Sequence, residues 1–198
     1  MQRRSLKLLP VLILAPALSG CISLAAKPPA SLLTIGATNV VEPGKVSDSG
    51  TSASITIQVP SVPASLATQR VPVQTSATSI AYVKDALWSE QPARLFARLM
   101  SDTIAAKTGR VVLTPAQSLF DPGARLSGEL RNFGIVEASG EAVVTFDAAL
   151  VRDGSKTYEK RRFEAREPVG TITPQSVGEA IDRAANRVAG DVATWVGR

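Results

Sequence analysis

The sequence predicts an α+β fold of two layers, an antiparallel-dominated β-sheet with two amphipathic helices packed on one face. Three β-prone segments follow one another between residues 126 and 166, and the short turns that join them allow only an antiparallel meander. Two further segments, 89–107 and 173–195, carry apolar residues at three- and four-residue steps, which is typical of a helix with one buried face. The open face of the sheet is the surface available to cover both stripes.

The chain divides into three parts. Residues 1–20 form a lipoprotein signal peptide, residues 21–53 a lipidated N-terminus with a flexible tether, and residues 54–198 the globular domain. The tether is rich in Ala, Ser, Gly, Pro and Thr, a composition that lacks the large apolar side chains of a core. Its exception is 32–35, which we expect to be a first strand.

Cys21 is the only cysteine and closes the tetrapeptide Leu18-Ser19-Gly20-Cys21, after a basic start and an apolar run from Leu8 to Leu18. This order is typical of a bacterial lipoprotein signal. The run has 11 residues, which span ~16 Å as a helix against ~30 Å of hydrocarbon, so it is too short to remain as an anchor. We expect cleavage before Cys21, a diacylglyceryl group on its sulfur and an acyl group such as palmitate on its new amino end. The alternative is an ordinary secretory signal that ends near a buried cysteine.

Processing removes most of the positive charge of the chain. The full sequence has 22 basic residues, of which Arg3, Arg4 and Lys7 lie in the signal, so 19 basic and 17 acidic residues remain and the net charge is +2. A charge this small gives no support to nucleic-acid binding. The chain has no histidine, and its single thiol carries lipid, so we expect no metal site, no cofactor and no enzyme of the His-triad or Cys-nucleophile type.

The first strand of the domain is expected in 54–59, where Ile55, Ile57 and Val59 alternate with polar residues and one face is buried. Two shorter β-prone pieces follow at 69–73 and 79–83.

The strands after the first helix begin with a short return at 110–113. In the meander, the alternation shifts phase near Asn132, which predicts a bulge, and 141–151 then keeps one apolar face. Asp153-Gly154 is a hairpin signal, and the third strand of the meander is expected at 156–166.

The two helices have start and stop signals. Ser89 is the expected cap of the first helix, with Pro92 in its first turn and Gly109 at its end. The second begins with Thr173 as cap and Pro174 as first residue, a favoured pairing.

Several features occur together in an order known from one family. They are the signal ending at Cys21, an early Leu-Thr strand, Ile55-Thr56-Ile57-Gln58-Val59-Pro60, Tyr82, Trp88-Ser89-Glu90-Gln91-Pro92 and the hairpin of 126–150. In these the chain resembles the ABC-type transport auxiliary lipoproteins, although its Trp88 segment departs from the usual Trp-Ala-Glu-Pro-Leu form.

The resemblance implies a non-enzymatic accessory role. Such lipoproteins accompany transporters with MCE (mammalian cell entry) domains, which move phospholipids and other hydrophobic compounds across the Gram-negative envelope. The implied partners are an MCE-domain protein and, through it, a permease and an ATPase, and a homo-oligomer around an MCE ring is compatible with this role. Ile22, which follows the lipidated cysteine, favours the periplasmic face of the outer membrane, with the inner membrane as the alternative.

Lys160, Arg161 and Arg162 form the only basic cluster, with Lys156 and Arg166 nearby. Alternate residues of a strand face opposite sides, so Lys160 and Arg162 share a face that Arg161 does not. The structural interpretation is a solvated edge strand that resists edge-to-edge pairing. The functional interpretation is attraction to anionic headgroups or an acidic partner.

Trp88, Tyr82 and Phe96 lie where a strand meets the first helix, and they are candidates for lining an acyl-chain pocket. Aromatic side chains at such a junction more often belong to the core. Trp195 is a candidate for a contact surface, although it also fits as cover for the sheet.

Two other functions remain open. An outer-membrane lipoprotein on a long tether could regulate envelope assembly, for example by activating a cell-wall synthase. The domain could instead bind lipid itself, for which it would need an apolar cavity.

Overall fold

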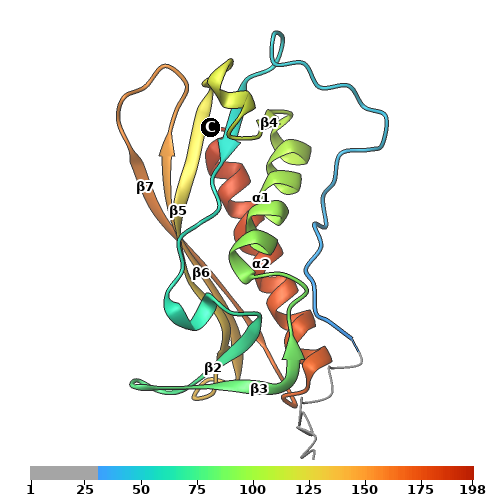
Figure 1. Cartoon of the computed structure of the whole chain (residues 1–198), viewed down its shortest axis with the longest axis vertical. Coiled ribbons are helices and arrows are strands. Elements are labelled where there is room, and N and C mark those ends of the chain that lie inside the picture. Colours follow the sequence, from blue (N-terminus) through green and yellow to red (C-terminus); the bar gives the residue numbers. More distant parts are fainter. Residues whose placement is uncertain (1–30) are drawn as a thin grey trace, which may run out of the picture.

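The computed structural model describes residues 31–198, so the predicted signal peptide and Cys21 lie outside the described residues. A sheet of seven strands forms one layer and two long helices form the other (Figure 1). The strands are β1 (Ser54–Ile57), β2 (Arg70–Ser76), β3 (Ser79–Leu87), β4 (Val111–Leu113), β5 (Ala124–Val136), β6 (Glu141–Val151) and β7 (Glu159–Pro168). The helices are α1 (Pro92–Thr108) and α2 (Pro174–Val196), with short 3-10 turns η1 (Ala64–Leu66) and η2 (Gln117–Leu119). The predicted α+β class is confirmed.

β5, β6 and β7 form the predicted antiparallel meander. The register of β5 against β6 is continuous except between Leu130 and Asn132, where the predicted irregularity lies. The turn at Asp153-Gly154 is present, but β7 begins at Glu159 and not at 156. The connection from β6 is therefore longer than a two-residue hairpin.

The free edge of β5 is shared by two strands. Its start pairs in parallel with β1, as Ile55 with Ala124, and its end pairs in parallel with β2, as Val73 with Ile135. β4 extends the sheet beyond β1 in parallel, and β3 extends it beyond β2 in antiparallel. The sequence indicated none of these parallel pairings, because each joins segments that are far apart in the chain.

β1 differs from its predicted one-sided burial. Its four residues are all buried, including Ser54 at 5% and Thr56 at 3% exposure. β1 lies between β4 and β5, and the Ser54 hydroxyl donates a hydrogen bond of 2.9 Å to Asp121 Oδ1, so the expected solvent face is covered. Val59, expected to be buried, lies beyond the end of the strand and is 58% exposed.

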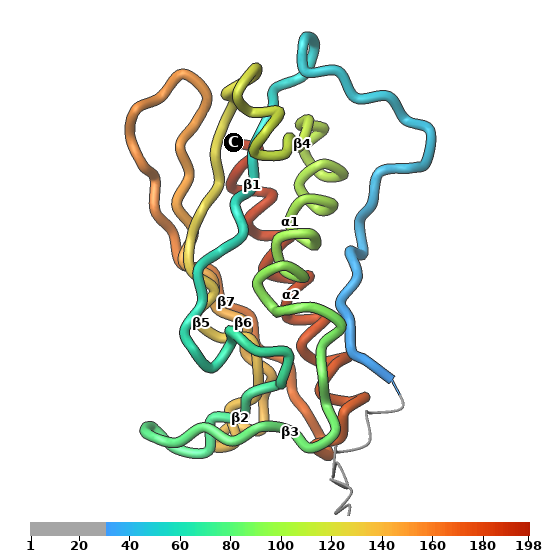
Figure 2. The backbone as a smooth tube through the Cα atoms, in the orientation of Figure 1, coloured from blue at the N-terminus to red at the C-terminus, as the bar shows by residue number. Residues whose placement is uncertain are grey.

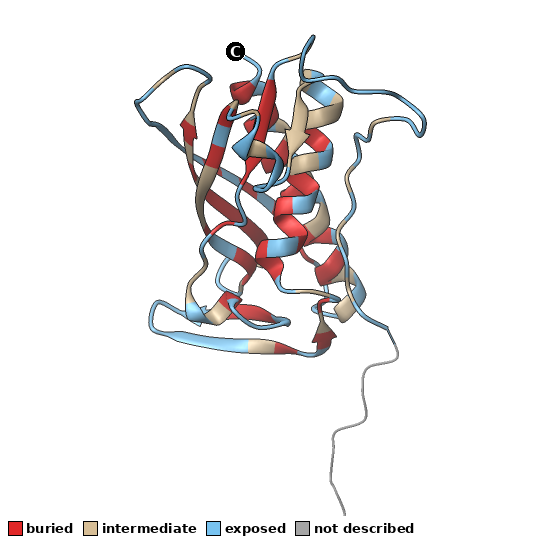
Figure 3. Ribbon diagram, turned by 45° about the horizontal axis from the view of Figure 1, so that its top comes forward, coloured by how far each residue is buried: buried red, intermediate tan, exposed pale blue. Residues whose placement is uncertain are grey.

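The helices pack on the same face of the sheet and against each other (Figure 2). α2 covers β6 and β7, and α1 lies beside it over β1 and β4. The buried residues gather between the two layers (Figure 3). A chain of aromatic rings crosses this core, with Phe133 5.2 Å from Trp88 and 6.4 Å from Phe96, and Phe96 5.4 Å from Phe146 between ring centroids.

The predicted caps are correct at two of the three helix ends that had one. Thr173 caps α2 and forms a capping box with Ser176, and Pro174 is the first helical residue. Gly109 ends α1 with a φ of 68°, which favours glycine. Ser89, by contrast, is not a cap: α1 begins at Pro92, and Gln91 occupies the cap position without a side-chain hydrogen bond to the helix.

Residues 33–38, which we name the strap, run along α2 (Figure 2). Leu33, in the predicted strand 32–35, forms only an isolated bridge with Trp88. Leu33, Ile35 and Ala37 pack against the core. The backbone N–H groups of Gly36 and Thr38 donate hydrogen bonds of 2.9 Å to Asp182 and Asn186, respectively. This part of the expected tether is therefore attached to the domain.

Within residues 31–198, no helix is both long and apolar enough to cross a membrane.

Candidate functional site

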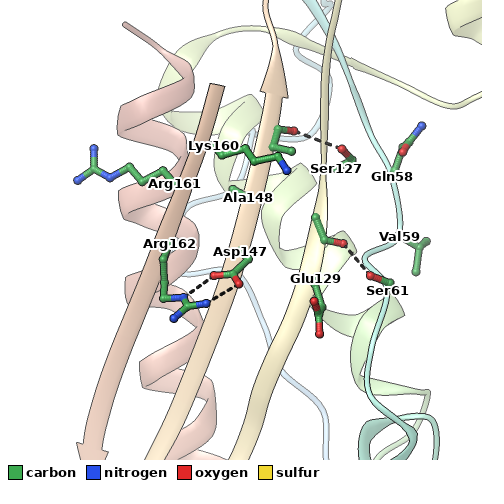
Figure 4. Close-up of a pocket in the computed structure, with 12 residues that line it drawn as sticks. Gln58, Val59, Ser61, Ser127, Glu129, Asp147, Ala148, Lys160, Arg161 and Arg162 are labelled. Carbon is green, nitrogen blue, oxygen red and sulfur yellow. Dashed lines mark hydrogen bonds and ion pairs between the residues drawn. The ribbon is translucent and has the colours of Figure 1, made fainter. Parts of the chain in front are cut away.

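A broad groove of about 820 Å³ lies on the outer face of the sheet (Figure 4). Leu126, Leu130 and Phe146 point into the core. Their immediate neighbours along β5 and β6 therefore point to the outer face of the sheet. The groove is lined by residues of β5, β6 and β7 together with the chain that follows β1. The lining residues are Gln58, Val59, Ser61, Ser127, Gly128, Glu129, Asp147, Ala148, Ala149, Lys160, Arg161 and Arg162.

Asp147 is the centre of the charges in this groove. Arg162 holds it in a two-pronged ion pair, with Nε 2.6 Å from Oδ1 and Nη2 2.7 Å from Oδ2 (Figure 4). Arg131 Nη1 lies 3.4 Å from Oδ2 of the same carboxylate and 3.8 Å from Oε2 of Glu129. The hydrogen bonds from Arg162, aided by the charges of both arginines, lower the pKa of Asp147 against a smaller effect of burial. The carboxylate therefore stays ionised at neutral pH and is already paired.

The hydroxyls of the groove are also engaged. The Ser127 hydroxyl donates to the Ala149 carbonyl at 3.3 Å, and the Ser61 hydroxyl donates to the Gly128 carbonyl at 3.3 Å. Lys160 forms no ion pair with any residue that the structure describes. Among residues 31–198 no group of three or more carboxylates is arranged to hold a metal ion. The groove thus has the character of a polar binding surface.

All three basic residues border the groove, but the Arg161 side chain points to the other side of β7, where its guanidinium lies 4.9 Å from the Phe163 ring (Figure 4). This is the alternation that the sequence predicted. β7 pairs only with β6, so the basic cluster does lie on an edge strand. Register, which the sequence left open, makes Asp147 the partner of Arg162.

Trp88 and Tyr82 are not brought together with the basic pair. Trp88 is fully buried, and its indole N–H is a buried donor without a partner. Phe96 is also fully buried, and Trp195 packs 5.5 Å from Phe163. Tyr82 lies on β3 with the Arg70 guanidinium 4.2 Å from its ring. Trp88 and Phe96 are therefore core residues.

A small cavity of about 240 Å³ is lined by Pro63, Leu66, Pro72, Ile80 and Phe133, among others. Pockets for small molecules typically have ~300–1,000 Å³. This volume gives weak support to the hypothesis that the domain itself carries lipid.

A second surface was missed by the sequence reasoning. Leu119 and Phe120, which we name the apolar tip, are 82% and 92% exposed. They lie in and just after η2, between Pro115 and the turn at Asp121-Pro122-Gly123. An apolar pair between turn residues was the available signal, since no strand or helix pattern accounts for it.

Comparisons with known proteins agree with this architecture. The family model described as ABC-type transport auxiliary lipoprotein component matches residues 38–193. No curated protein matches the chain significantly. Protein XCC0632 from Xanthomonas campestris has 14% identity and a TM-score of 0.65, with 83% of this chain and 94% of that chain covered. A crystal structure of an uncharacterized protein has 13% identity and a TM-score of 0.63, with 84% and 99% covered. Both show the fold alone.

The matched segment contains every strand, all of α1 and all but the last residues of α2. The chain belongs to the family of ABC-type transport auxiliary lipoprotein components.

Proposed function

We propose that this protein is a membrane-anchored accessory lipoprotein that docks with an MCE-domain protein of an ABC-type transporter. The transporter would move phospholipid or another hydrophobic compound across the Gram-negative envelope. The observation that carries the proposal is the family match over residues 38–193, which associates the chain with an ABC-type transport system in the cell envelope.

The proposed anchor is Cys21, acylated after signal cleavage. Two or three acyl chains hold a protein at a bilayer where one does not, because each buried CH2 contributes ~0.8 kcal/mol. Ile22 in the following position supports the periplasmic face of the outer membrane as the location.

The groove supports a docking role rather than catalysis. Its carboxylate Asp147 is paired with Arg162 and Arg131, and its serines hydrogen-bond to neighbouring strands. Lys160 is the groove cation left for a partner, since Arg162 is held by Asp147. Tyr82 and Trp88 are weaker candidates for a partner contact, because neither lines the groove and Trp88 is buried in the core.

The test is a crosslinking pull-down of the tagged, lipidated protein from its native envelope, with mass spectrometry of the captured proteins. We expect an MCE-domain protein together with its permease or ATPase. Cys21→Ala, which removes the lipid site, is the matched control for anchoring. Capture of a cell-wall synthase in place of these proteins would contradict the transport role and favour regulation of envelope assembly.

A further inference from the structure

We infer that the apolar tip, Leu119 and Phe120, inserts into an apolar pocket of a protein partner at the end of the domain that is turned away from the bilayer. The inference rests on the proposed function, from which it takes the lipid anchor and the existence of a partner in the transport system. It adds the surface of contact and the orientation of the domain.

The tip is exposed on a loop whose backbone is held in place. Gln117 Oε1 accepts hydrogen bonds from the backbone N–H and the hydroxyl of Thr114 at 2.9 and 3.0 Å. The Ser118 hydroxyl donates to the Pro115 carbonyl at 2.8 Å, and Asp121 accepts from Ser54 of β1. An apolar anchor presented on a pre-organised loop loses little conformational entropy on binding.

The strap shows at which end of the domain the lipid anchor lies. Along the strap, Leu33 lies against Gly178, Gly36 bonds to Asp182 and Thr38 bonds to Asn186, so the chain climbs α2 from its N-terminal end. The described chain therefore begins at the N-terminal end of α2, where Ser31 lines the same pocket as Thr173 and Pro174 (Figure 1).

The tip lies at the opposite end of α2. Asp121, next to Phe120, is bonded to Ser54, and the Ser54 carbonyl accepts from Arg110 at the end of α1. Gly197, just after α2, lies beside Thr108, the last residue of α1. The loop after β4 and the C-terminus are thus at one end of the molecule (Figure 1).

These positions decide between a bilayer and a protein as the occupant. Nine residues lie between Cys21 and Ser31. The ten steps from Cys21 to Ser31 reach at most ~36 Å when fully extended. α2 has 23 residues, or ~35 Å. The tip would meet the bilayer that holds the anchor only if the whole segment between Cys21 and Ser31 ran back along the domain. The tip therefore faces a protein.

The first experiment is the pull-down with Leu119→Ser and Phe120→Ser combined in the lipidated full chain. The exposed side chains carry no core contacts, so the variant should keep the unmodified melting temperature. We expect recovery of the transporter proteins to fall at least about tenfold, as for an interface anchor. Ile80→Ser is the matched control, because Ile80 is 52% exposed on β3 at the anchor end and should leave recovery unchanged.

The outcomes separate this inference from the proposed function. If the unmodified protein recovers no transporter protein, the proposed function fails. Equal recovery by the unmodified chain and the tip variant would overturn the tip alone. A tip variant that sediments as a smaller species than the unmodified chain would make a second copy the occupant and would also overturn it.

Orientation is measured separately on phosphatidylethanolamine/phosphatidylglycerol vesicles with nitroxide-labelled lipid. Because the only native cysteine is the proposed lipid site, Ala116→Cys beside the tip or Ser79→Cys on β3 can each be labelled alone. We expect stronger quenching at Ser79 than at Ala116. The reverse order would place the tip at the bilayer and refute the inference.

Discussion

Asp147 shows how one carboxylate organises the outer face of the sheet. Its side chain is 30% exposed, yet two arginines from different strands converge on it. Arg162 comes from β7, directly across the β6–β7 ladder, and Arg131 comes from β5. The three strands of the meander are thus joined by charge as well as by backbone hydrogen bonds.

We expect the pKa of Asp147 in the folded protein to be lower than the ~3.9 of an unfolded chain. The pair's contribution to stability is therefore complete above pH ~4 and is lost as the pH falls through the folded-state value, because the unfolded state binds the proton first. Titration of the Asp147 carboxyl carbon by NMR measures this. Arg162→Gln should raise the pKa, whereas Arg161→Gln, on the other side of β7, should not. An equal effect of both changes would show that the hydrogen bond is not the cause.

Trp88 makes a different point at the same scale. It is central to the aromatic core, but its indole N–H has no acceptor. Trp88, a candidate for lining a pocket from the sequence, is a buried member of the core that packs on Phe133.

At the scale of elements, the two helices differ in how they begin. α2 has a side-chain cap and a capping box, whereas α1 begins at a proline after Gln91 with no side-chain cap. Both begin with proline, whose fixed φ suits the first helical position. α1 therefore owes its start more to packing, with Pro92, Ala93, Leu95 and Phe96 all buried.

Removing the α2 cap should be measurable and specific. Thr173→Ala loses the hydroxyl that accepts from the Ser176 backbone N–H, and we expect the free energy of unfolding to fall by about 1 kcal/mol. Ser89→Ala is the control, because Ser89 precedes α1 without capping it. Urea unfolding of the chain from Ser31 gives both values. A loss at Ser89 as large as at Thr173 would contradict the assignment of the caps.

At the scale of the whole molecule, the strap connects the N-terminal segment to the α-helical layer. Asn186 donates to the Gly36 carbonyl at 2.8 Å and accepts from the backbone N–H of Thr38, so one side chain satisfies both backbone groups. Leu33 contacts α2 at Gly178, where an added Cβ would lie 3.0 Å from its methyl group. The strap is therefore part of the folded domain.

A chain that begins at Ser54 should accordingly be less stable than one that begins at Ser31. Loss of the half-buried Leu33 and Ile35 and of the hydrogen bonds to α2 should lower the free energy of unfolding by roughly 2–4 kcal/mol. In the longer chain, Asp182→Ala with Asn186→Ala should reproduce part of that loss. Equal melting temperatures for the two chains would mean that the strap adds nothing to stability.

Local patterns in the sequence predicted several features of this fold. The apolar face shared by Val144, Phe146, Ala148 and Leu150, the phase shift near Asn132 and the Thr173-Pro174 start each depend on neighbouring residues, and the structure has all three. These features follow from backbone sterics and from periods of 2 and 3.6 residues, so they can be derived without knowing the partners.

Only the tertiary structure decided what depends on distant partners. The parallel pairing of β1 with β4 and β5 buries Ser54. The pairing of Asp147 with Arg162 depends on a register that follows a longer loop than Asp153-Gly154 suggested. Asn186 binds the strap, which lies some 150 residues earlier in the chain. The exposure of Phe120 is a further example, because it depends on whether a distant part of the chain packs over this side chain. Contacts between remote segments are set by the packing of whole layers, and the local sequence on either side does not encode their register.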